Sequence, residues 1–516
     1  MGHIFLYGPP ASGKSTVGKI LAENLNLPFI DLDDRTKQAA GMDISQVMDE
    51  RGEAGFRELE TTEFERLHVD SDSVVALGGG TLLRDGNRSC AESDGEIICL
   101  DAGLDTLQQH LAYDTNTRPL LEGDLPEKLA ILLAGRAAHY ASFPTRIGVD
   151  GRTPEQIAWK IQVTLGRFNL RSMGAGYDAV VRSGSIDSLG MLLQAHELQN
   201  PMIVTDVNVA KFHADHVQDS LRRSQYTPGL LSIPAGESSK TLDTITGLWR
   251  GFLEAGLDRR STVVALGGGV VGDLAGFAAA TFMRGVDWVA VPTTLLSMVD
   301  ASLGGKTGFD LPEGKNLIGS FHPPRLVMAD PQVLSTLPEP ELRSGLAEVV
   351  KHGIIADPDL FEICARGFEV VLNDLPQIVR RAMAVKIRII EDDPYEKGSR
   401  ASLNLGHTVG HAVESVSGYR LRHGEAVAIG MVAEARLAEY LSIAGKGLSA
   451  RIAEALSALG LPIQIPKDLS KEKLIHAMRF DKKKAAGSVR FALPVEIGRV
   501  QVNVEVKDLE LLFKEN

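Results

Sequence analysis

The chain has 516 residues, of which 44% are hydrophobic and 23% are charged, and its formal net charge is −13. Because one hydrophobic core usually serves roughly 100–200 residues, this length predicts about three domains. The acidic balance argues against general nucleic-acid binding, and no apolar run approaches the roughly 20 residues that span a bilayer, so we expect a cytoplasmic protein without a signal peptide. Cys90, Cys99 and Cys364 have no paired spacing, which argues against a disulfide framework or a thiolate metal site.

The first segment alternates short β-type runs with amphipathic helical patterns. Strands are predicted at residues 4–7, 74–77, 96–100 and 146–149. Thr153-Pro154-Glu155 opens a capped helix that runs to residue 165. We therefore predict an α/β domain with a parallel sheet over residues 1–166, followed by a linker over residues 167–176 in which a short strand is possible.

A phosphate-binding loop lies between the first strand and the first helix. Gly8 to Ser15 fits G-x-x-x-x-G-K-S, in which backbone N–H groups and a helix N-terminus surround a polyphosphate. Lys14 adds a positive charge, and the Ser15 hydroxyl can bind magnesium. The predicted ATP-binding residues of this loop are Gly8, Ser12, Gly13, Lys14, Ser15 and Thr16.

The α/β alternation restarts at residue 177 and then gives way to helices. Strands are predicted at residues 202–206, 229–233, 263–266 and 288–291, and helices at residues 339–352, 375–390, 407–416 and 425–443. These patterns predict an α/β domain over residues 177–330 and a mostly α-helical domain over residues 331–516.

Polar residues end several strands of the second α/β domain, at the edge where a dinucleotide would lie across the sheet. The run Gly267-Gly268-Gly269 is weak alone, because it lacks the G-x-G-x-x-G spacing. The other positions at this edge are Asp206, Asn208, Glu237, Lys240, Asp273, Thr293 and Thr294.

The helical segment holds metal-ligand and phosphate-binding residue types. One carboxylate, Glu348, and two imidazoles with an open fourth position suit a catalytic zinc. His407 and His411 share one helix face, so their spacing alone allows either one to be a ligand beside His423. Lysines and an arginine at Gly turns and helix faces indicate a pocket for phosphate and carboxylate groups: Lys306, Lys315, Lys351, Lys386 and Arg400.

Five elements of the first segment, in their order and spacing, resemble shikimate kinase over residues 1–166. They are Asp31-Leu32-Asp33, Arg57 in Gly55-Phe56-Arg57-Glu58-Leu59-Glu60, Leu77-Gly78-Gly79-Gly80, Thr117-Arg118-Pro119-Leu120-Leu121, and Arg136 before Tyr140. The resemblance implies that Asp31 helps Ser15 to place magnesium, that Arg118 lies on a mobile lid over ATP, and that Asp33 orients or accepts the proton of the attacking hydroxyl. Ala11 departs from the family, which usually has Gly there. The implied shikimate-binding residues are Asp33, Arg57, Gly79, Gly80 and Arg136.

The motifs of residues 177–516 resemble 3-dehydroquinate synthase. The resemblance implies zinc or cobalt at Glu348, His407 and His423. It also implies that His411, behind these ligands, transfers a proton or lies near the substrate phosphate. The implied NAD⁺ contacts are Asp206, Asn208, Glu237, Lys240, Gly268, Gly269, Val270, Asp273, Thr293 and Thr294. The implied substrate contacts are Asp300, Lys306, Lys315, Asn316, Lys351, Lys386, Glu396, Arg400 and Asn404. One further lysine is expected among Lys482, Lys483 and Lys484, and the run does not choose between them.

Together these resemblances predict a bifunctional enzyme for two non-consecutive steps of the shikimate route, with small-molecule substrates and a homodimer formed through the synthase half. The catalytic residues would be Asp33, Lys14, Lys306, Lys351, His411 and Lys386. The alternatives are another small-molecule P-loop kinase in the first half, and another sugar-phosphate cyclase or a metal-dependent alcohol dehydrogenase in the second. So many phosphate-facing lysines favour the synthase over a dehydrogenase.

Overall fold

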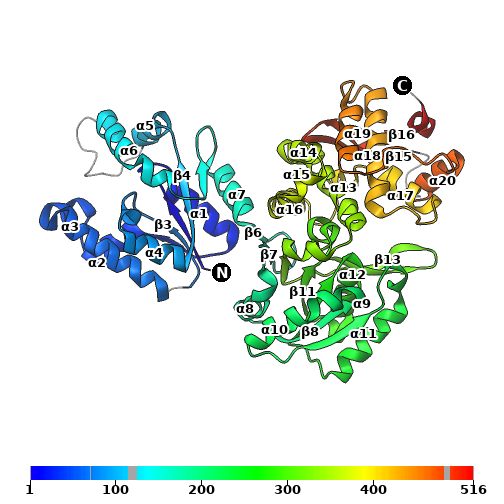
Figure 1. The fold of residues 1–516 in the computed structure, drawn as a ribbon, viewed down its shortest axis with the longest axis horizontal. Helices are drawn as coiled ribbons and strands as arrows, with labels where there is room; N and C mark the ends of the chain where they lie inside the picture. Colours follow the sequence, from blue (N-terminus) through cyan, green and yellow to red (C-terminus); the bar gives the residue numbers. More distant parts are fainter. Residues whose placement is uncertain (1, 70, 114–124, 482–487, 515–516) are drawn as a thin grey trace. The chain divides into compact units, whose positions relative to one another are not determined.

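The computed structural model describes residues 2–69, 71–113, 125–481 and 488–514. The chain divides into two compact units, Met1–Asn169 and Leu170–Asn516 (Figure 1). The division falls inside the segment expected to be a linker, where the short strand β6 (Arg167–Leu170) forms. Among the described residues, no helix is both long enough and apolar enough to cross a bilayer.

The first unit is built on a five-stranded parallel sheet in the order β2-β3-β1-β4-β5. Alternate residues of β1 enter two hydrophobic clusters: Ile4 and Leu6 pack on one face, and Phe5 and Tyr7 on the other. A strand buried on both faces explains the unbroken apolar run. The strands are β1 (His3–Tyr7), β2 (Phe29–Asp31), β3 (Val74–Ala76), β4 (Gly95–Asp101) and β5 (Arg146–Gly148), and the helices are α1 (Lys14–Leu25), α2 (Leu32–Ala40), α3 (Ile44–Glu65), α4 (Asp85–Asp94), α5 (Leu104–Tyr113), α6 (Leu125–Ala141) and α7 (Pro154–Leu165).

The segment Phe29 to Asp34 crosses from a strand into a helix. Strand β2 stops at Asp31, whose side chain accepts a hydrogen bond from the Asp33 backbone N–H at 3.1 Å and so caps helix α2. An N-cap carboxylate satisfies one of the free N–H groups of the first turn, which makes helix more favourable than continued strand. Asp33 therefore lies in the first turn of α2.

The second unit begins with a seven-stranded α/β sheet in the order β6-β7-β14-β11-β10-β8-β9, in which the strands from β7 to β9 pair in parallel. The chain passes from β8 to β9 on one side and then to β10 on the other side of β8, so strand order reverses between β8 and β10. Ligands of open α/β sheets bind at such a reversal. The elements are β7 (Tyr177–Val181), α8 (Leu189–Ala195), β8 (Gln199–Asp206), α9 (Val207–Val209), α10 (Asp215–Arg223), β9 (Gly229–Ile233), α11 (Leu242–Glu254), β10 (Ser261–Gly267), α12 (Gly269–Thr281), β11 (Asp287–Pro292) and β14 (Leu326–Ala329).

Two antiparallel hairpins were not expected from the sequence. The first joins β12 (Lys306–Leu311) to β13 (Gly314–Phe321) and carries three of the expected substrate residues. The second joins β15 (Val489–Glu496) to β16 (Arg499–Val506) within the mostly helical domain. In β16 buried or half-buried valines alternate with exposed polar residues. This period of two was the sequence signal for the strand.

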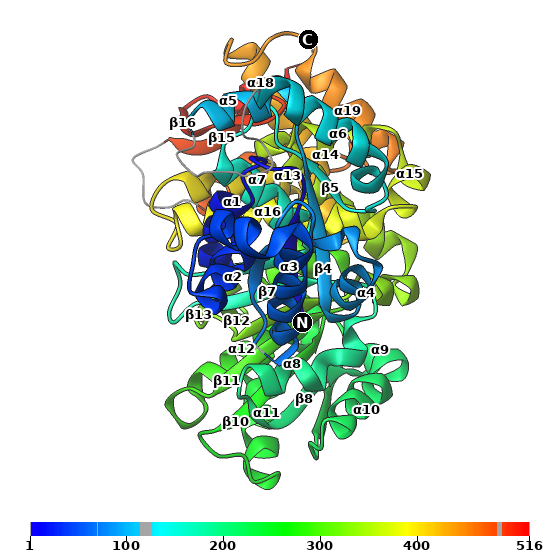
Figure 2. The same ribbon diagram turned by 90° about the vertical axis from the view of Figure 1, so that its left-hand side faces the viewer.

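The remaining helices gather on one side of the second unit, away from strands β8 to β11, and the view turned by 90° keeps this separation (Figures 1 and 2). Helix α18 begins two residues earlier than expected because Glu425 accepts the Arg422 backbone N–H at 2.8 Å in a capping box. The helices are α13 (Glu339–Ala356), α14 (Pro358–Ala365), α15 (Phe368–Leu372), α16 (Leu375–Asp392), α17 (His407–Val416), α18 (His423–Tyr440), α19 (Leu448–Ala458) and α20 (Lys471–Asp481).

Candidate active sites

The phosphate loop of the first unit leaves the carboxyl end of β1 and enters α1 at Lys14. Lys14 Nζ donates to the carbonyl oxygens of Gly8 at 3.0 Å and Pro9 at 2.8 Å, so the ammonium group is held over its own loop. Ser15 Oγ donates to Asp31 Oδ2 at 2.6 Å. A hydroxyl and a carboxylate at this separation are the oxygen ligands that magnesium prefers, which fits the expected roles of Ser15 and Asp31.

The glycine loop after β3 packs against the phosphate loop. A Cβ on Gly79 would lie 3.2 Å from the Gly8 carbonyl oxygen, and a Cβ on Gly80 would lie 2.6 Å from Arg57 Nη2. The Gly79 carbonyl oxygen accepts hydrogen bonds from Arg136 Nη1 at 3.0 Å and Tyr140 Oη at 2.9 Å. The structure therefore brings together the expected residues Arg57, Gly79, Gly80 and Arg136.

Asp33 faces the same loop, since a Cβ on Gly78 would lie 3.2 Å from Asp33 Oδ1. Burial raises the pKa of Asp33 to about 6, and the nearby carboxylates of Asp31 and Glu60 add to this increase. A carboxyl group whose pKa is raised toward neutrality can accept a proton from a substrate hydroxyl more readily. Arg118 lies outside the described residues.

Side chains outside the predicted set hold this site in place. Buried Glu60 accepts from Arg57 Nη1 at 2.8 Å and from Thr81 Oγ1 at 2.7 Å, which orients the guanidinium group. Tyr7 Oη donates to the Gly79 carbonyl oxygen at 3.2 Å. The spacing of three residues between Arg57 and Glu60 on one helix face was the available signal for the first contact.

The second unit holds a cluster of possible metal ligands formed by Glu348 of α13, His407 of α17 and His423 of α18. Glu348 Oε1 lies 3.6 Å from His407 Nε2 and 3.5 Å from His423 Nε2. Two ligands bound tetrahedrally at about 2.0–2.1 Å from zinc lie about 3.4 Å apart, so these separations fit three ligands around one ion. The geometry thus places His407, rather than His411, in one ligand group with Glu348 and His423.

Hydrogen bonds at Nδ1 orient both imidazoles of the cluster. His407 Nδ1 lies 3.1 Å from the Leu405 carbonyl oxygen, and His423 Nδ1 lies 3.3 Å from Glu414 Oε2. A proton held at Nδ1 leaves the Nε2 lone pair free for a metal. The ring of His411 lies close by, with centroids 5.2 Å from His407 and 5.9 Å from His423.

Charges around the cluster favour a cation there. Burial by itself lowers the pKa of His423, but hydrogen bonds to Glu348 and Glu414 outweigh burial and raise it to about 9. Burial raises the pKa of Glu348, but the Lys351 ammonium outweighs it and holds that pKa below its usual range. Two carboxylates on one imidazole stabilise positive charge, which a divalent ion would also supply.

Three of the expected substrate residues lie beside this cluster: Asp300, Lys351 and Lys386. Lys351 pairs with Glu348, and Lys386 Nζ donates to Asp300 Oδ1 at 2.6 Å. Burial lowers the pKa of Lys386, although Asp300 opposes this effect. Arg400 is buried beside the Gly304 turn and Glu396, whereas Asn404 is exposed at the end of the short helical turn 399–404. The Lys482 to Lys484 run lies outside the described residues.

The hairpin β12–β13 carries the other two lysines to carboxylates of the helical domain. Lys306 Nζ pairs with Glu396, and Lys315 Nζ donates to Glu414 Oε1 at 2.9 Å. Lys315 Nζ also lies 3.3 Å from Glu237 Oε1 of the α/β domain. Both ammonium groups therefore contact the helical domain, and Lys315 is held between carboxylates of both domains of the second unit.

The expected dinucleotide contacts lie where strand order reverses. Asp206 caps the turn after β8, accepting from the Asn208 N–H at 2.8 Å, and the Asn208 side chain is exposed. Helix α12 begins at Gly269 directly after β10, which points its N-terminus and Val270 at this edge. A Cβ on Gly268 would lie 3.1 Å from Thr294 Cγ2, so a glycine allows close approach there.

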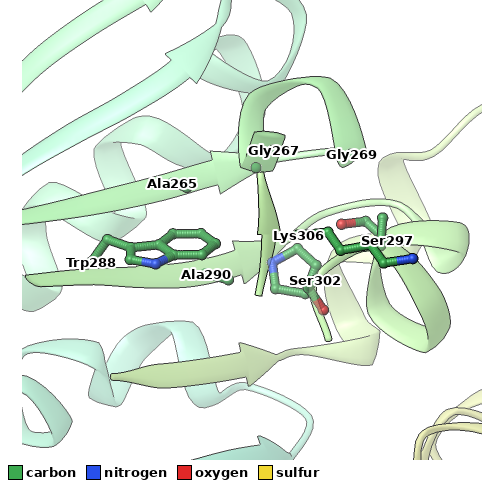
Figure 3. Close-up of a pocket in the computed structure, with 11 residues that line it drawn as sticks. Ala265, Gly267, Gly269, Trp288, Ala290, Ser297, Ser302 and Lys306 are labelled. Atoms are coloured by element: carbon green, nitrogen blue, oxygen red, sulfur yellow. The ribbon is translucent and has the colours of Figure 1, made fainter. Parts of the chain in front are cut away.

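Two further features shape this edge. Buried Lys240 pairs with Asp273 Oδ2 at 2.7 Å and with Asn316, which joins the nucleotide side to the hairpin. A small pocket lies between the ends of β10 and β11 and the turn Ser297–Ala301. Figure 3 shows the Trp288 ring pointing along this space toward Ser302 and Lys306.

Comparisons with known proteins match each unit to a family. The shikimate kinase family model matches residues 10–165, and the 3-dehydroquinate synthase N-terminal and C-terminal models match residues 230–344 and 345–484. A 3-dehydroquinate synthase of Symbiobacterium thermophilum is 45% identical over 337 residues, which cover 64% of this chain and 94% of that protein.

Two solved structures resemble the second unit. The structure of 2-deoxy-scyllo-inosose synthase complexed with carbaglucose-6-phosphate, NAD⁺ and Co²⁺ has a TM-score of 0.62 at 25% identity, covering 67% of this chain and 98% of that one. ValA, a 2-epi-5-epi-valiolone synthase from Streptomyces hygroscopicus subsp. jinggangensis 5008 with NAD⁺ and Zn²⁺ bound, has a TM-score of 0.58 at 28% identity, covering 65% and 94%.

The phosphate loop at the end of a parallel sheet makes the first unit a P-loop kinase, and the second unit is a two-domain enzyme with a nucleotide edge and a metal-ligand cluster. The chain belongs to the 3-dehydroquinate synthase family and carries a shikimate kinase domain before the synthase. It is a bifunctional enzyme of the shikimate pathway.

Proposed function

We propose that the first unit phosphorylates shikimate through the residues gathered around its glycine loop. Arg57 and Arg136 would bind the shikimate carboxylate, since guanidinium groups pair with carboxylates in a planar, bidentate manner. Asp33 would bind the ring hydroxyls and take the proton of the attacking one, which its raised pKa supports. Lys14 and the loop N–H groups would neutralise the ATP phosphates, with magnesium between Ser15 and Asp31.

We propose that the second unit converts 3-deoxy-arabino-heptulosonate 7-phosphate to 3-dehydroquinate and phosphate. When bound, NAD⁺ supplies a hydride acceptor and donor, and zinc or cobalt at Glu348, His407 and His423 supplies a Lewis acid for the substrate carbinol. The separations of 3.5 and 3.6 Å in the ligand cluster carry this assignment.

The remaining synthase residues would bind the substrate and move its protons. Lys306, Lys315 and Asn316 of the hairpin would bind anionic groups of the substrate together with Arg400 and Asn404. Lys351 and Lys386, both buried beside Glu348 and Asp300, would orient the reacting hydroxyls. His411, next to the ligand rings, would transfer a proton near the leaving phosphate.

The alternatives named for the second unit are less well supported. Identity to 3-dehydroquinate synthases is 43–45% over two representative relatives, against 25–28% for the two cyclases of other specificity. The two hairpin lysines, Lys306 and Lys315, also fit a phosphorylated substrate better than the small alcohol of a dehydrogenase.

We propose a homodimer through the synthase unit and a cytoplasmic location from the family resemblance. Sedimentation tests the first proposal, and cell fractionation tests the second.

A coupled assay of the purified full-length protein with each substrate tests the proposal. We expect NAD⁺-dependent release of phosphate from the heptulosonate phosphate and ATP-dependent consumption of shikimate. Loss of phosphate release on Glu348→Gln, with shikimate phosphorylation retained, would support the metal-site assignment. Failure of the unmodified protein to release phosphate would end the synthase assignment, and failure to consume shikimate would end the kinase assignment.

A further inference from the structure

Glu414 of α17 contacts both a proposed metal ligand and a proposed substrate lysine. Its Oε2 lies 3.3 Å from His423 Nδ1, and its Oε1 accepts from Lys315 Nζ at 2.9 Å. The side chain is only 11% exposed, so water screens neither contact strongly. One carboxylate therefore joins the helical metal cluster to the hairpin of the α/β domain.

The two imidazoles of the cluster differ in what holds their Nδ1 atoms. His407 Nδ1 faces a backbone carbonyl oxygen, that of Leu405 at 3.1 Å, whereas His423 Nδ1 faces the charged Glu414. A carboxylate behind a ligand histidine fixes its tautomer and increases its basicity toward the metal more than a neutral carbonyl does. The strength of the His423 ligand therefore depends on how much negative charge Glu414 presents to it.

Lys315 controls that charge, because it shares the same carboxylate. Its ammonium group is held by Glu414, by Glu237 Oε1 at 3.3 Å and by the Tyr419 ring at 4.5 Å. An ammonium group that turns toward a substrate anion would withdraw less negative charge from Glu414. His423 would then become the stronger metal ligand at the moment when substrate occupies the site.

Lys306 provides a natural comparison on the same hairpin. It also pairs with a carboxylate of the helical domain, Glu396. Glu396 in turn contacts Arg400, whereas Glu414 contacts a histidine of the cluster. The same kind of ion pair therefore exists twice, and in the pair with Glu414 the carboxylate also contacts a proposed metal ligand.

We propose that Glu414 is a positioning residue that couples the metal site to Lys315, so that anion binding at Lys315 tightens metal binding. This inference rests on the proposed metal site at Glu348, His407 and His423. Because coupling free energies are reciprocal, metal binding would strengthen anion binding at Lys315 by the same factor.

Metal affinity of the full-length protein, measured by competition between cobalt and a chromophoric chelator, tests the coupling. Glu414→Gln keeps the size of the side chain and should weaken cobalt binding about 10-fold to 100-fold, with a shifted cobalt ligand-field spectrum. Lys315→Met should tighten cobalt binding at least threefold. Lys306→Met should change the cobalt affinity by less than half of the change that Lys315→Met causes. In the Glu414→Gln background, Lys315→Met should have no effect on cobalt binding.

The outcomes separate this inference from the proposed function. Cobalt affinity unchanged in Glu414→Gln, or equal effects of Lys315→Met and Lys306→Met, would overturn the coupling while leaving the metal site intact. An additive double variant would overturn it as well, because independent sites add. Unchanged cobalt affinity in Glu348→Gln would instead overturn the metal site itself, and circular dichroism of each variant detects any that fail to fold.

Discussion

Two single residues of the kinase unit, Asp33 and Ala11, have unusual properties that experiments can test. Asp33 is half-buried beside two other carboxylates, and its pKa is raised from the ordinary value of 3.8 to about 6. At the phosphate loop, Ala11 has a φ of +63°, in the left-handed region that glycine adopts more easily. Each of these features leads to a measurable effect.

Shikimate kinase activity should fall as pH drops below about 6, because Asp33 must be ionised to accept a proton. We expect kcat/KM to decrease about tenfold per pH unit on this limb. The folded carboxyl binds its proton more tightly than the unfolded one, so this group favours folding more as pH falls through 6 toward 3.8. Activity loss at pH 5.5 should therefore be reversible, with an unchanged circular dichroism spectrum.

Asp34→Asn is the matched control for the pH profile, since Asp34 is exposed and pairs with Lys37 at 3.2 Å. This variant should keep the acidic limb near pH 6. A kinase profile that stays flat down to pH 5 would show that Asp33 does not accept the proton.

Ala11→Gly should stabilise the kinase unit by roughly 0.5 kcal/mol. Relief of the left-handed conformation contributes about 1 kcal/mol, and the greater freedom of glycine in the unfolded chain offsets about half of it. Denaturant unfolding followed in the kinase unit measures the change. Ala22→Gly in the buried face of α1 is the control and should destabilise by about 1 kcal/mol or more, and a loss of stability for Ala11→Gly would contradict a strained loop.

Arg57→Ala should lower kcat/KM for shikimate by roughly 10-fold to 100-fold, since a charge-assisted hydrogen bond contributes about 1.5–3 kcal/mol. Synthase turnover of the same preparation should not change, because the proposed partner of Arg57 is a carboxylate bound in the first unit alone. Parallel assays of the two activities measure this, and a comparable loss in both would mean that the units form one catalytic or folding entity.

Helices α17 and α18 approach so closely that only glycine fits between them. A Cβ on Gly430 would lie 1.9 Å from the Gly406 carbonyl oxygen, and one on Gly424 would lie 1.9 Å from the Ser344 carbonyl oxygen of α13. Since these contacts are to backbone, a methyl group can fit only if whole helices separate. The close packing fixes the elements that carry His407 and His423.

Gly430→Ala should therefore destabilise the synthase unit by about 1–3 kcal/mol and weaken metal binding, because it moves α18 away from α17. Denaturant unfolding and cobalt affinity measure the two effects. Gly445→Ala, where a Cβ would meet nothing within 4 Å, is the control and should stay within about 0.5 kcal/mol of the unmodified protein. Equal effects of the two substitutions would argue against helix separation as the cause.

The whole molecule combines two kinds of metal dependence in one chain. The kinase would use exchangeable magnesium with ATP, held by a hydroxyl and a carboxylate, whereas the synthase cluster offers two imidazoles and one carboxylate. Hard, hydrated magnesium prefers oxygen ligands and replaces zinc poorly at a site with two histidines.

A strong chelator should silence both activities, and excess magnesium should restore the kinase alone. Zinc or cobalt, added with NAD⁺ after removal of the chelator, should restore the synthase. Separate assays after each addition measure the order of recovery. Synthase activity that survives thorough chelation, or that returns with magnesium alone, would remove the proposed roles of His407 and His423.

Local pattern was sufficient to predict the architecture, and the resemblances to two families implied most of the residues that gather at each site. The strand, loop and helix around Gly8 to Ser15, the long helices of the last domain, and the motif around Arg57 and Gly79 depend on neighbours close in sequence. Such features are determined by periodicity, capping and glycine placement, which a sequence displays directly.

The tertiary structure decided contacts between residues far apart in the chain. His407 and His411 were equivalent by spacing, and only the position of α13 places Glu348 within 3.6 Å of His407 Nε2 while His423 occupies the second imidazole position. The hairpin β12–β13 and the contacts of Glu60 and Glu414 were likewise missed. The geometry of the metal ligands depends on how the helices pack. The electrostatics of the site depend on which charged side chains are buried next to one another, and a local stretch of sequence shows neither.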